Sequence, residues 1–472
     1  MTKSIILTLC FLLSITSLSA RSRQLPLDTA RALQSAVISY KMVDLETGAV
    51  VASRNSSQCA TPASITKIIT TATALELLGP DFTFDTRIET DGILLDDGTL
   101  EGNIIIRGGA DPTLGSIFLG DRNFISHFAI QIQRYGIRRI TGNIVATASC
   151  LDHCPVPLKW SWEDIGAHYG AGAFGLSAFD NTSIITLRSG ATGSKPEVLS
   201  IWPEMPNMRT FNEIIVPIIP KDSVVVFNAP YSHQRILQGC ISPNRNNQVV
   251  KASISNPPLL VADYLYNELR GRGITIDGSA IVDDTTRFAS SDTIYTNHSR
   301  RLEEVIRLTN YKSNNLYAEL TFRRLGCING MTCATTGMAT TMVKTFWTGA
   351  GLDCNSLFLY DGCGLAPQNA FNADFLTDVL IYMDKSRYRD QFYNSLPTAG
   401  KEGTVAGFLR NTPLEGRARI KSGSISGVQC YSGYITAASG HRYAFTIMMN
   451  NYSCSRRDIR KIMEHWLTRD AK

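Results

Sequence analysis

Residues 61–80 (TPASITKIITTATALELLGP) constrain the fold most, because their pattern predicts one helix with defined ends. Pro62 lies where a helix can begin, and Gly79-Pro80 is a stop signal. Apolar residues recur at helical spacing from Ile65 to Leu75, which predicts a buried face. Residues 36–53, just before, carry the pattern of a β-hairpin. A hairpin that leads into a helix favours an α+β domain with helices packed on an antiparallel sheet.

Ser64 and Lys67 lie three residues apart at the start of this helix, so both side chains point to the same side of its first turn. A serine needs a base within hydrogen-bond reach to act as a nucleophile. A lysine can be that base when it is neutral, and burial and neighbouring positive charge lower its pKa toward neutrality. Lys67 is the only lysine with a serine three residues before it. The pair is therefore a candidate nucleophile and base; the alternative is a helix-start serine beside a surface lysine.

The length and composition of the chain bound the remaining possibilities. A chain of 472 residues exceeds one ordinary hydrophobic core, so we expect two or three domains. A hydrophobic content of 44% and a charged content of 18% indicate a folded protein. The formal charge of +5 is modest and no long basic run occurs, so we expect no nucleic-acid partner.

Residues 1–20 combine Lys3, an apolar run from Ile5 to Leu13 and small residues up to Ala20, which predicts a cleaved secretory signal peptide. No later stretch reaches about 18 apolar residues, so we expect a soluble exported protein with at most peripheral membrane contact. A basic C-terminal helix over residues 458–469 is expected to pack on the sheet, with contact to a membrane surface as the alternative.

Ten cysteines remain beyond Cys10, and an even number in an exported protein permits disulfides. We expect several to be oxidised, with Cys150/Cys154 and Cys327/Cys333 close enough in sequence to be local pairs; buried thiols are the alternative. No second Cys/His pair follows to complete a zinc site around His153, so no metal is predicted.

Two further motifs follow the serine helix. Ser313-Asn314-Asn315 interrupts a helical region over residues 302–325, and Lys421-Ser422-Gly423 is expected to open a strand. Taken alone, the first would be a helix cap or turn and the second a loop that leads into a strand. Lys421 is the only lysine followed by Ser or Thr and then Gly. Ser-x-x-Lys, Ser-x-Asn and Lys-Ser/Thr-Gly in this order are the motifs of penicillin-binding proteins and β-lactamases.

With these motifs the chain resembles the low-molecular-mass, class C penicillin-binding proteins of the D-alanyl-D-alanine carboxypeptidase/endopeptidase type, which are serine peptidases with a large insert in the catalytic domain. The resemblance spans nearly the whole mature chain. The family usually has serine where Cys363 stands, a departure outside the three motifs. Further matching stretches are residues 100–104 (LEGNI), 108–112 (GGADP), 160–164 (WSWED), 361–365 (DGCGL), 396–400 (LPTAG) and 403–405 (GTV).

The resemblance implies an α+β fold. A penicillin-binding/β-lactamase-like catalytic domain, an antiparallel sheet flanked by helices, would carry a large and mainly β insert that forms two smaller domains. The expected division is a signal peptide at residues 1–20, a split catalytic domain at 21–85 and 286–472, insert domain II at 86–184 and 246–285, and a small β domain III at 185–245.

The resemblance also implies roles at the catalytic residues. Ser64 would be the acylated nucleophile, and Lys67 would be the base. Ser313 would relay a proton to the leaving amine, while Asn315 would hold Lys67 and the substrate amide. Lys421 would lower the pKa of Lys67 and attract the terminal carboxylate of the substrate.

A second group of residues would bind the substrate. Ser422 would donate to the terminal carboxylate, next to Gly423. The backbone N–H groups of Ser64 and Ser424 would form the oxyanion hole. Asp164, with Glu163, is a candidate for binding the amino end of a peptidoglycan stem peptide, and ordinary solvated acids are the alternative.

These roles predict a periplasmic serine D,D-peptidase that removes the terminal D-Ala from stem pentapeptides or cuts D-Ala–diaminopimelate cross-links through a Ser64 acyl-enzyme. β-Lactams would be covalent inhibitors, and no cofactor is implied. Two alternatives stay open. A β-lactamase or esterase on the same scaffold would deacylate penicillin rapidly, and a non-catalytic wall-binding protein would not need the intact motifs.

Overall fold

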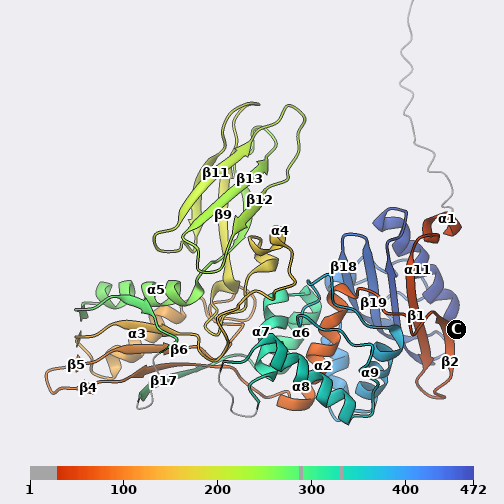
Figure 1. Cartoon of the computed structure of the whole chain (residues 1–472), viewed down its shortest axis with the longest axis horizontal. Coiled ribbons are helices and arrows are strands. Elements are labelled where there is room, and N and C mark those ends of the chain that lie inside the picture. The colour runs from red at the N-terminus through yellow and green to blue at the C-terminus, as the bar shows by residue number, and fades with distance from the viewer. Residues whose placement is uncertain (1–28, 286–290, 329–332, 472) are drawn as a thin grey trace, which may run out of the picture.

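The computed structural model describes residues 29–285, 291–328 and 333–471, and the predicted signal peptide lies outside the described residues (Figure 1). Within the described ranges no helix combines the length and apolar character needed to cross a bilayer.

A five-stranded antiparallel sheet forms the centre of the predicted catalytic domain, in the order β18-β19-β20-β1-β2. The predicted hairpin is β1 (Val37–Asp44) and β2 (Val50–Arg54). β1 pairs with β20, so strands from the two ends of the chain close one sheet. The C-terminal strands are β18 (Ala418–Ile425), β19 (Val428–Thr436) and β20 (Arg442–Asn450).

Helices cover both faces of this sheet, because successive side chains of a strand point to opposite faces. On β19, Cys430 and Tyr434 join one core, and Tyr431 and Ile435 join the other. The first core is shared with α2 (Thr66–Leu78), α6 (Leu302–Lys312), α7 (Asn315–Leu325), α8 (Thr336–Gly349), α9 (Ala373–Lys385) and α10 (Arg389–Ser395). The second core is shared with α1 (Thr29–Leu33) and α11 (Arg456–Asp470), so the C-terminal helix packs on the sheet as expected.

The insert leaves the catalytic domain after α2 and contains a domain with two sheets and two helices around one core. The larger sheet has the order β16-β8-β6-β3-β17, with β3 (Asp85–Thr90), β6 (Ile104–Arg107), β8 (Ile144–Thr147), β16 (Ala280–Val282) and β17 (Asp292–His298). The smaller sheet has the order β15-β7-β5-β4, with β4 (Ile93–Leu94), β5 (Thr99–Glu101), β7 (Arg139–Ile140) and β15 (Thr275–Ile276). The helices are α3 (Phe124–Arg134) and α5 (Pro257–Gly271).

A second insert unit, called domain III here, projects from the molecule between the other two parts (Figure 1). Two three-stranded sheets enclose its small apolar core. One has the order β10-β9-β14, with β9 (Thr182–Arg188), β10 (Glu197–Trp202) and β14 (Gln248–Ser253). The other has the order β11-β13-β12, with β11 (Arg209–Ile215), β12 (Val225–Asn228) and β13 (Gln234–Cys240).

Strand pairing bears on the predicted domain edges, which remain a proposal. β14 pairs with β9 although it lies beyond residue 245, and β17 pairs with β3 although it lies beyond residue 286. Because hydrogen-bonded strands share one sheet, a division by sheets would move these two edges to the ends of β14 and β17.

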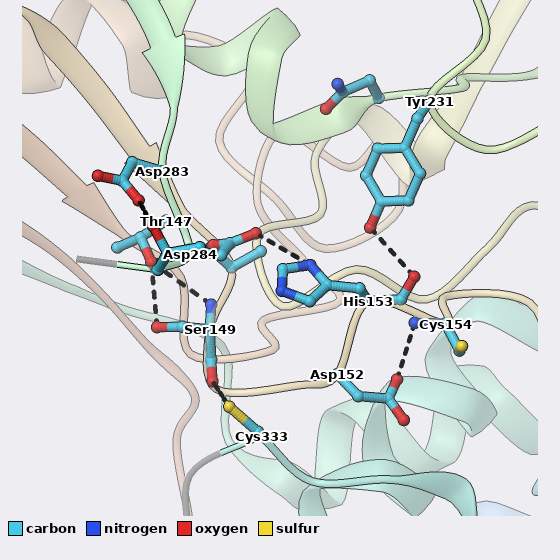
Figure 2. Close-up of polar contacts among 12 residues, drawn as sticks. Thr147, Ser149, Asp152, His153, Cys154, Tyr231, Asp283, Asp284 and Cys333 are labelled. Carbon is cyan, nitrogen blue, oxygen red and sulfur yellow. Dashed lines mark hydrogen bonds and ion pairs between the residues drawn. The ribbon is translucent and has the colours of Figure 1, made fainter. Parts of the chain in front are cut away.

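All ten described cysteines are free, so the prediction that several are oxidised is wrong for this structure. Neither Cys150/Cys154 nor Cys327/Cys333 forms a disulfide. Three of these four thiols use backbone acceptors instead: Cys150 donates to the Gly175 carbonyl at 3.7 Å, Cys327 to the Cys150 carbonyl at 3.4 Å and Cys333 to the Ser149 carbonyl at 3.3 Å. Figure 2 shows Cys333 against Ser149, where the insert meets the segment between α7 and α8.

Candidate active site

Ser64 lies in a single 3₁₀ turn (Ala63–Ile65) that leads directly into α2, so the predicted helix starts with a tighter turn. Ala63 adopts a left-handed conformation with φ of 48°. Two glycines from distant parts of the chain pack on this turn. A Cβ on Gly364 would lie 1.9 Å from the Ala63 carbonyl oxygen, and one on Gly423 would lie 2.5 Å from that of Pro62. Close backbone approach from two sides therefore holds the turn in place.

Lys67, one turn into α2, is fully buried with its Nζ at three oxygens. Nζ lies 2.9 Å from Ser64 Oγ, 2.8 Å from Asn315 Oδ1 and 2.7 Å from the Cys363 carbonyl oxygen. Burial lowers the pKa of Lys67, while the nearby acidic groups, Cys363 first among them, act in the opposite direction. The amide and carbonyl oxygens can only accept, so each takes an N–H from Nζ. In the neutral amine the remaining position is a lone pair, and it faces the serine hydroxyl.

The break between α6 and α7 presents two side chains of the Ser-x-Asn motif to Lys67 and Lys421. Ser313 ends α6 in a left-handed conformation (φ 54°), and Asn315 is the first residue of α7. The middle residue of the motif, Asn314, is a helix cap: its Oδ1 accepts from the Tyr317 N–H at 3.1 Å, at the start of α7. Asn315 contacts Lys67 through Oδ1 and donates from Nδ2 to the Tyr169 carbonyl at 2.7 Å.

Lys421 lies within β18 rather than at the opening of a strand, because the strand already begins at Ala418. Its buried Nζ donates to Ser313 Oγ at 2.9 Å and to the Ser422 carbonyl at 2.6 Å. Burial places the pKa of Lys421 well below its ordinary value, and repulsion from Lys67 lowers it further; burial also lowers the pKa of Lys67. Because charge repulsion is mutual, the expected influence of Lys421 on the pKa of Lys67 stays a prediction.

β18 is the edge strand of the sheet, and its free edge faces the serine. The Ile420 N–H donates to the Pro397 carbonyl at 3.0 Å, on the side away from β19. Backbone groups alternate in direction along a strand, so the N–H groups of Ser422 and Ser424 point to the same outer edge. A Cβ on Gly423 would lie 3.0 Å from the Ser64 nitrogen, which shows how closely this edge approaches the serine turn.

Ser422 contacts a residue to which sequence reasoning gave no role. Its hydroxyl lies 2.7 Å from Thr404 Oγ1, beside the exposed end of the 3₁₀ turn Gly403–Val405. The only hint of a role for Thr404 in the sequence is that residues 403–405 match the family. Two hydroxyls and the Lys421 amine thus line one side of the site.

Sequence reasoning gave no role to three buried groups near Lys67: it missed Glu319, and it recognised Asp361 and Cys363 only as part of the matching stretch 361–365. Glu319, Asp361 and Cys363 are fully buried, and one ligand-type atom of each lies within 4.8 Å of the others. Glu319 follows Asn315 by one helical turn, which places both on one face of α7. Burial, with the charge of Asp361 second, raises the pKa of Glu319 to about 8.

This buried cluster supports the loop that carries the Cys363 carbonyl. Glu319 Oε1 accepts from the Gly362 N–H at 2.7 Å. Both Asp361 oxygens already accept two hydrogen bonds each, so they offer a metal little free coordination capacity. The four donors are the Gly364 N–H at 2.7 Å, Asn369 Nδ2 at 2.7 Å, the Ala366 N–H at 2.6 Å and Trp160 Nε1 at 2.9 Å.

Asp164 lies in α4 (Trp162–Ile165), at a groove of about 920 Å³ between this segment and domain III. Its Oδ1 accepts from Tyr169 Oη at 2.9 Å, and burial raises its pKa. Because the Tyr169 carbonyl binds Asn315, the groove is structurally joined to the serine site. The structure thus brings together Ser64, Lys67, Ser313, Asn315 and Lys421, with the β18 edge on one side and Asp164 further out.

The family model of the D-Ala-D-Ala carboxypeptidase 3 (S13) family matches residues 25–470. The chain belongs to this family. It is 24% identical over 412 residues to the D-alanyl-D-alanine carboxypeptidase DacB of Haemophilus influenzae, covering 86% of this chain and 83% of that protein. It is 26% identical over 434 residues to a D-alanyl-D-alanine carboxypeptidase of Actinomadura sp., covering 89% and 79%.

The fold agrees with the family. The crystal structure of penicillin binding protein 4 from H. influenzae superposes with a TM-score of 0.85 at 21% identity, covering 95% of this chain and all of that chain. This S13 protein is a serine-type D,D-peptidase of the penicillin-binding class, as the three motifs predicted. The α+β fold with additional, mainly β domains is confirmed.

Proposed function

We propose that Ser64 is the acylated nucleophile of this S13 peptidase, with Lys67 as its base, and that the substrates are D-Ala-terminated stem peptides of peptidoglycan. The observation that carries the proposal is the coordination of Lys67 Nζ. Two acceptors, Asn315 Oδ1 and the Cys363 carbonyl, take its N–H groups and leave the third position, 2.9 Å away, for the Ser64 hydroxyl. A neutral Lys67 is thereby oriented to accept the serine proton as attack begins.

Acylation then proceeds at the edge of β18. Ser64 Oγ attacks the carbonyl of the penultimate D-Ala, and its proton passes to Lys67. In this proposal the backbone N–H groups of Ser64 and Ser424 stabilise the oxyanion, and the close approach of Gly423 to the Ser64 nitrogen supports this role. The two donors are fixed in position before the substrate binds, because both belong to backbone segments that pack closely at Gly423.

The leaving group departs on the Lys421 side. Ser313, 2.9 Å from Lys421 Nζ, passes a proton to the leaving amine, and the lysine replenishes it. The terminal carboxylate binds beside Ser422, Thr404 and Lys421. Two buried amines that repel each other are best described as one titrating pair, and the proposed steps need one proton on the pair, first on Lys421 and after acylation on Lys67. Water attack on the acyl-enzyme, with the same groups in reversed roles, completes hydrolysis.

The groove at Asp164 offers room for the part of a longer substrate that extends beyond the scissile bond. A cross-linked peptide extends beyond the scissile bond, and a carboxylate in this groove can pair with a cationic group of the stem. We therefore propose that the enzyme works as a carboxypeptidase on pentapeptides and as an endopeptidase on D-Ala–diaminopimelate cross-links, in the periplasm. The predicted signal peptide supports that location.

The test is whole-protein mass after brief exposure to penicillin. A complex of the H. influenzae protein with a β-lactam makes such a ligand a reasonable probe. We expect an adduct of one drug mass in the wild type, absent in Ser64→Ala and retained in Ser57→Ala, an exposed serine seven residues away. Rapid drug hydrolysis without an adduct would indicate a β-lactamase, and intact drug without an adduct would indicate a non-catalytic protein. Purified pentapeptide and cross-linked muropeptides then separate the two peptidase activities.

A further inference from the structure

We infer that the far tip of domain III is a contact surface for an anionic phospholipid bilayer. Three loops form this tip, because β9, β11 and β13 all end there. They are residues 189–196, 216–224 and 241–247, and they are tied together by the hydrogen bonds Gly193 N–H to Val216 O at 3.0 Å and Asn244 N–H to Gly190 O at 2.9 Å. Figure 1 shows this end of β11 and β13 as the part of domain III farthest from the insert's other sheets.

The tip exposes two consecutive isoleucines. Ile218 is 84% exposed and Ile219 is 80% exposed, and Ile215 at the end of β11 adds a third apolar side chain at 62%. Prolines on both sides, Pro217 and Pro220, restrict the backbone of this loop. Isoleucine side chains held in water by a restricted backbone are unfavourably solvated and add nothing to the core. Such an exposed apolar group indicates a binding surface.

The charge around the isoleucines selects the partner. Lys221 follows Pro220 in the isoleucine loop, and Lys195 lies in the loop 189–196 that is hydrogen-bonded to it. Both lysines are exposed, and among the described residues neither forms a salt bridge. The other charged groups of the loops compensate one another, since Asp222 lies 3.7 Å from Arg245. The tip is therefore apolar at its centre and positive at its rim. Apolar side chains that enter the headgroup region beside lysines that meet anionic lipid are the pattern of a peripheral membrane contact.

This inference does not depend on the catalytic proposal, because the tip lies in a different part of the fold from Ser64. It assigns domain III a role in holding the exported enzyme at a membrane surface. A second copy of the chain is the other possible occupant, and it is an outcome of the test.

The experiment is co-sedimentation of the full mature chain with vesicles of phosphatidylcholine and phosphatidylglycerol at a 7:3 ratio. We expect the double variant Ile218→Ser/Ile219→Ser to lower the partition coefficient by about tenfold or more. Lys195→Gln/Lys221→Gln should lower it by about tenfold on these vesicles and by less on pure phosphatidylcholine. High salt should reproduce the effect of the lysine variant.

The matched control is Ile93→Ser/Leu158→Ser, which removes apolar side chains that are 70% and 90% exposed on other parts of the surface. It should bind vesicles as the wild type does. Penicillin acylation and the melting temperature check that every variant is folded. Absence of vesicle binding by the wild type, or equal losses in the tip and control variants, would overturn the inference. So would sedimentation velocity that shows a dimer dispersed by the tip variant.

Discussion

Gly423→Ala is the substitution for which the structure predicts the largest effect from the smallest change. The added Cβ would lie 2.5 Å from the Pro62 carbonyl oxygen, 2.9 Å from the Ile65 nitrogen and 3.0 Å from the Ser64 nitrogen. All three are backbone atoms, so no flexible side chain can turn away. Ordinary contact starts at 3.4 Å, which means that β18 must withdraw from the serine turn by about 0.9 Å.

A displacement of this size would misplace both the proposed oxyanion donor, the Ser424 N–H, and the Ser422 hydroxyl proposed to bind the substrate carboxylate. A shift of about 1 Å costs about 100-fold in rate, and loss of one oxyanion donor costs about 100- to 1,000-fold. We therefore expect the second-order rate constant for acylation by a fluorescent penicillin to fall at least about 100-fold. Peptide hydrolysis should fall in parallel, because both reactions form the same oxyanion.

The assay measures adduct formation against time at several drug concentrations, with thermal melting as the check on folding. Gly271→Ala is the matched control: a Cβ there meets nothing within 4 Å, and the backbone is not left-handed. It should react at the wild-type rate. A folded Gly423→Ala protein that acylates within about twofold of wild type would refute the argument that close approach of β18 sets the reactive geometry.

Three further predictions concern other parts of the site. Burial raises the pKa of Glu319 from 4.5 to about 8, so between these pH values the folded protein keeps a proton that the unfolded chain releases. The free energy of unfolding of the wild type therefore falls as the pH rises across that range. Glu319→Gln should therefore gain stability over wild type with rising pH, by on the order of 4 kcal/mol near pH 7.5, and a difference in melting temperature that does not change with pH would contradict this. Thr404→Val should raise KM for a pentapeptide about tenfold with little change in kcat, and the effect should vanish with a C-terminally amidated substrate. Asn314→Ala should lower the free energy of unfolding by about 1 kcal/mol through loss of a helix cap and leave the acylation rate unchanged. Asn315→Ala should slow acylation, because Asn315 contacts Lys67. Slow acylation in both variants would argue against a capping role for Asn314 and a site role for Asn315.

The elements near the serine follow from local patterns that the sequence carries. The apolar spacing from Ile65 to Leu75 predicts α2, and the break at Ser313 predicts two helices in place of one. The pairing of Ser64 with Lys67 also needs only helical geometry, because residues three apart share a face. Each of these interactions lies within a few residues along the chain.

Other features depended on residues far apart in sequence. The position of Lys421 within β18, rather than before a strand, depends on pairing with β19 and on the neighbouring Pro397 carbonyl. The expected disulfides fail for a similar reason, since proximity in sequence does not bring two sulfur atoms together, and the thiols of Cys327 and Cys333 bond to backbone carbonyls instead. The predicted edges of the insert stay a proposal, and they too depend on non-local contacts, because β14 and β17 pair with strands about 60 and 200 residues earlier.

The sequence by itself determined the family, the order of the three motifs and the identity of the candidate nucleophile and base, because motif residues and helical spacing are local properties. Only the tertiary structure decided which atoms surround Lys67. The Cys363 carbonyl and the Asn315 amide reach it from segments about 250 to 300 residues away, and Glu319 supports the first of these by accepting from the Gly362 N–H. No spacing rule specifies a carbonyl that any residue could supply. The candidate base Lys67 is therefore identified by its motif, but its environment is set by packing between distant segments of the chain.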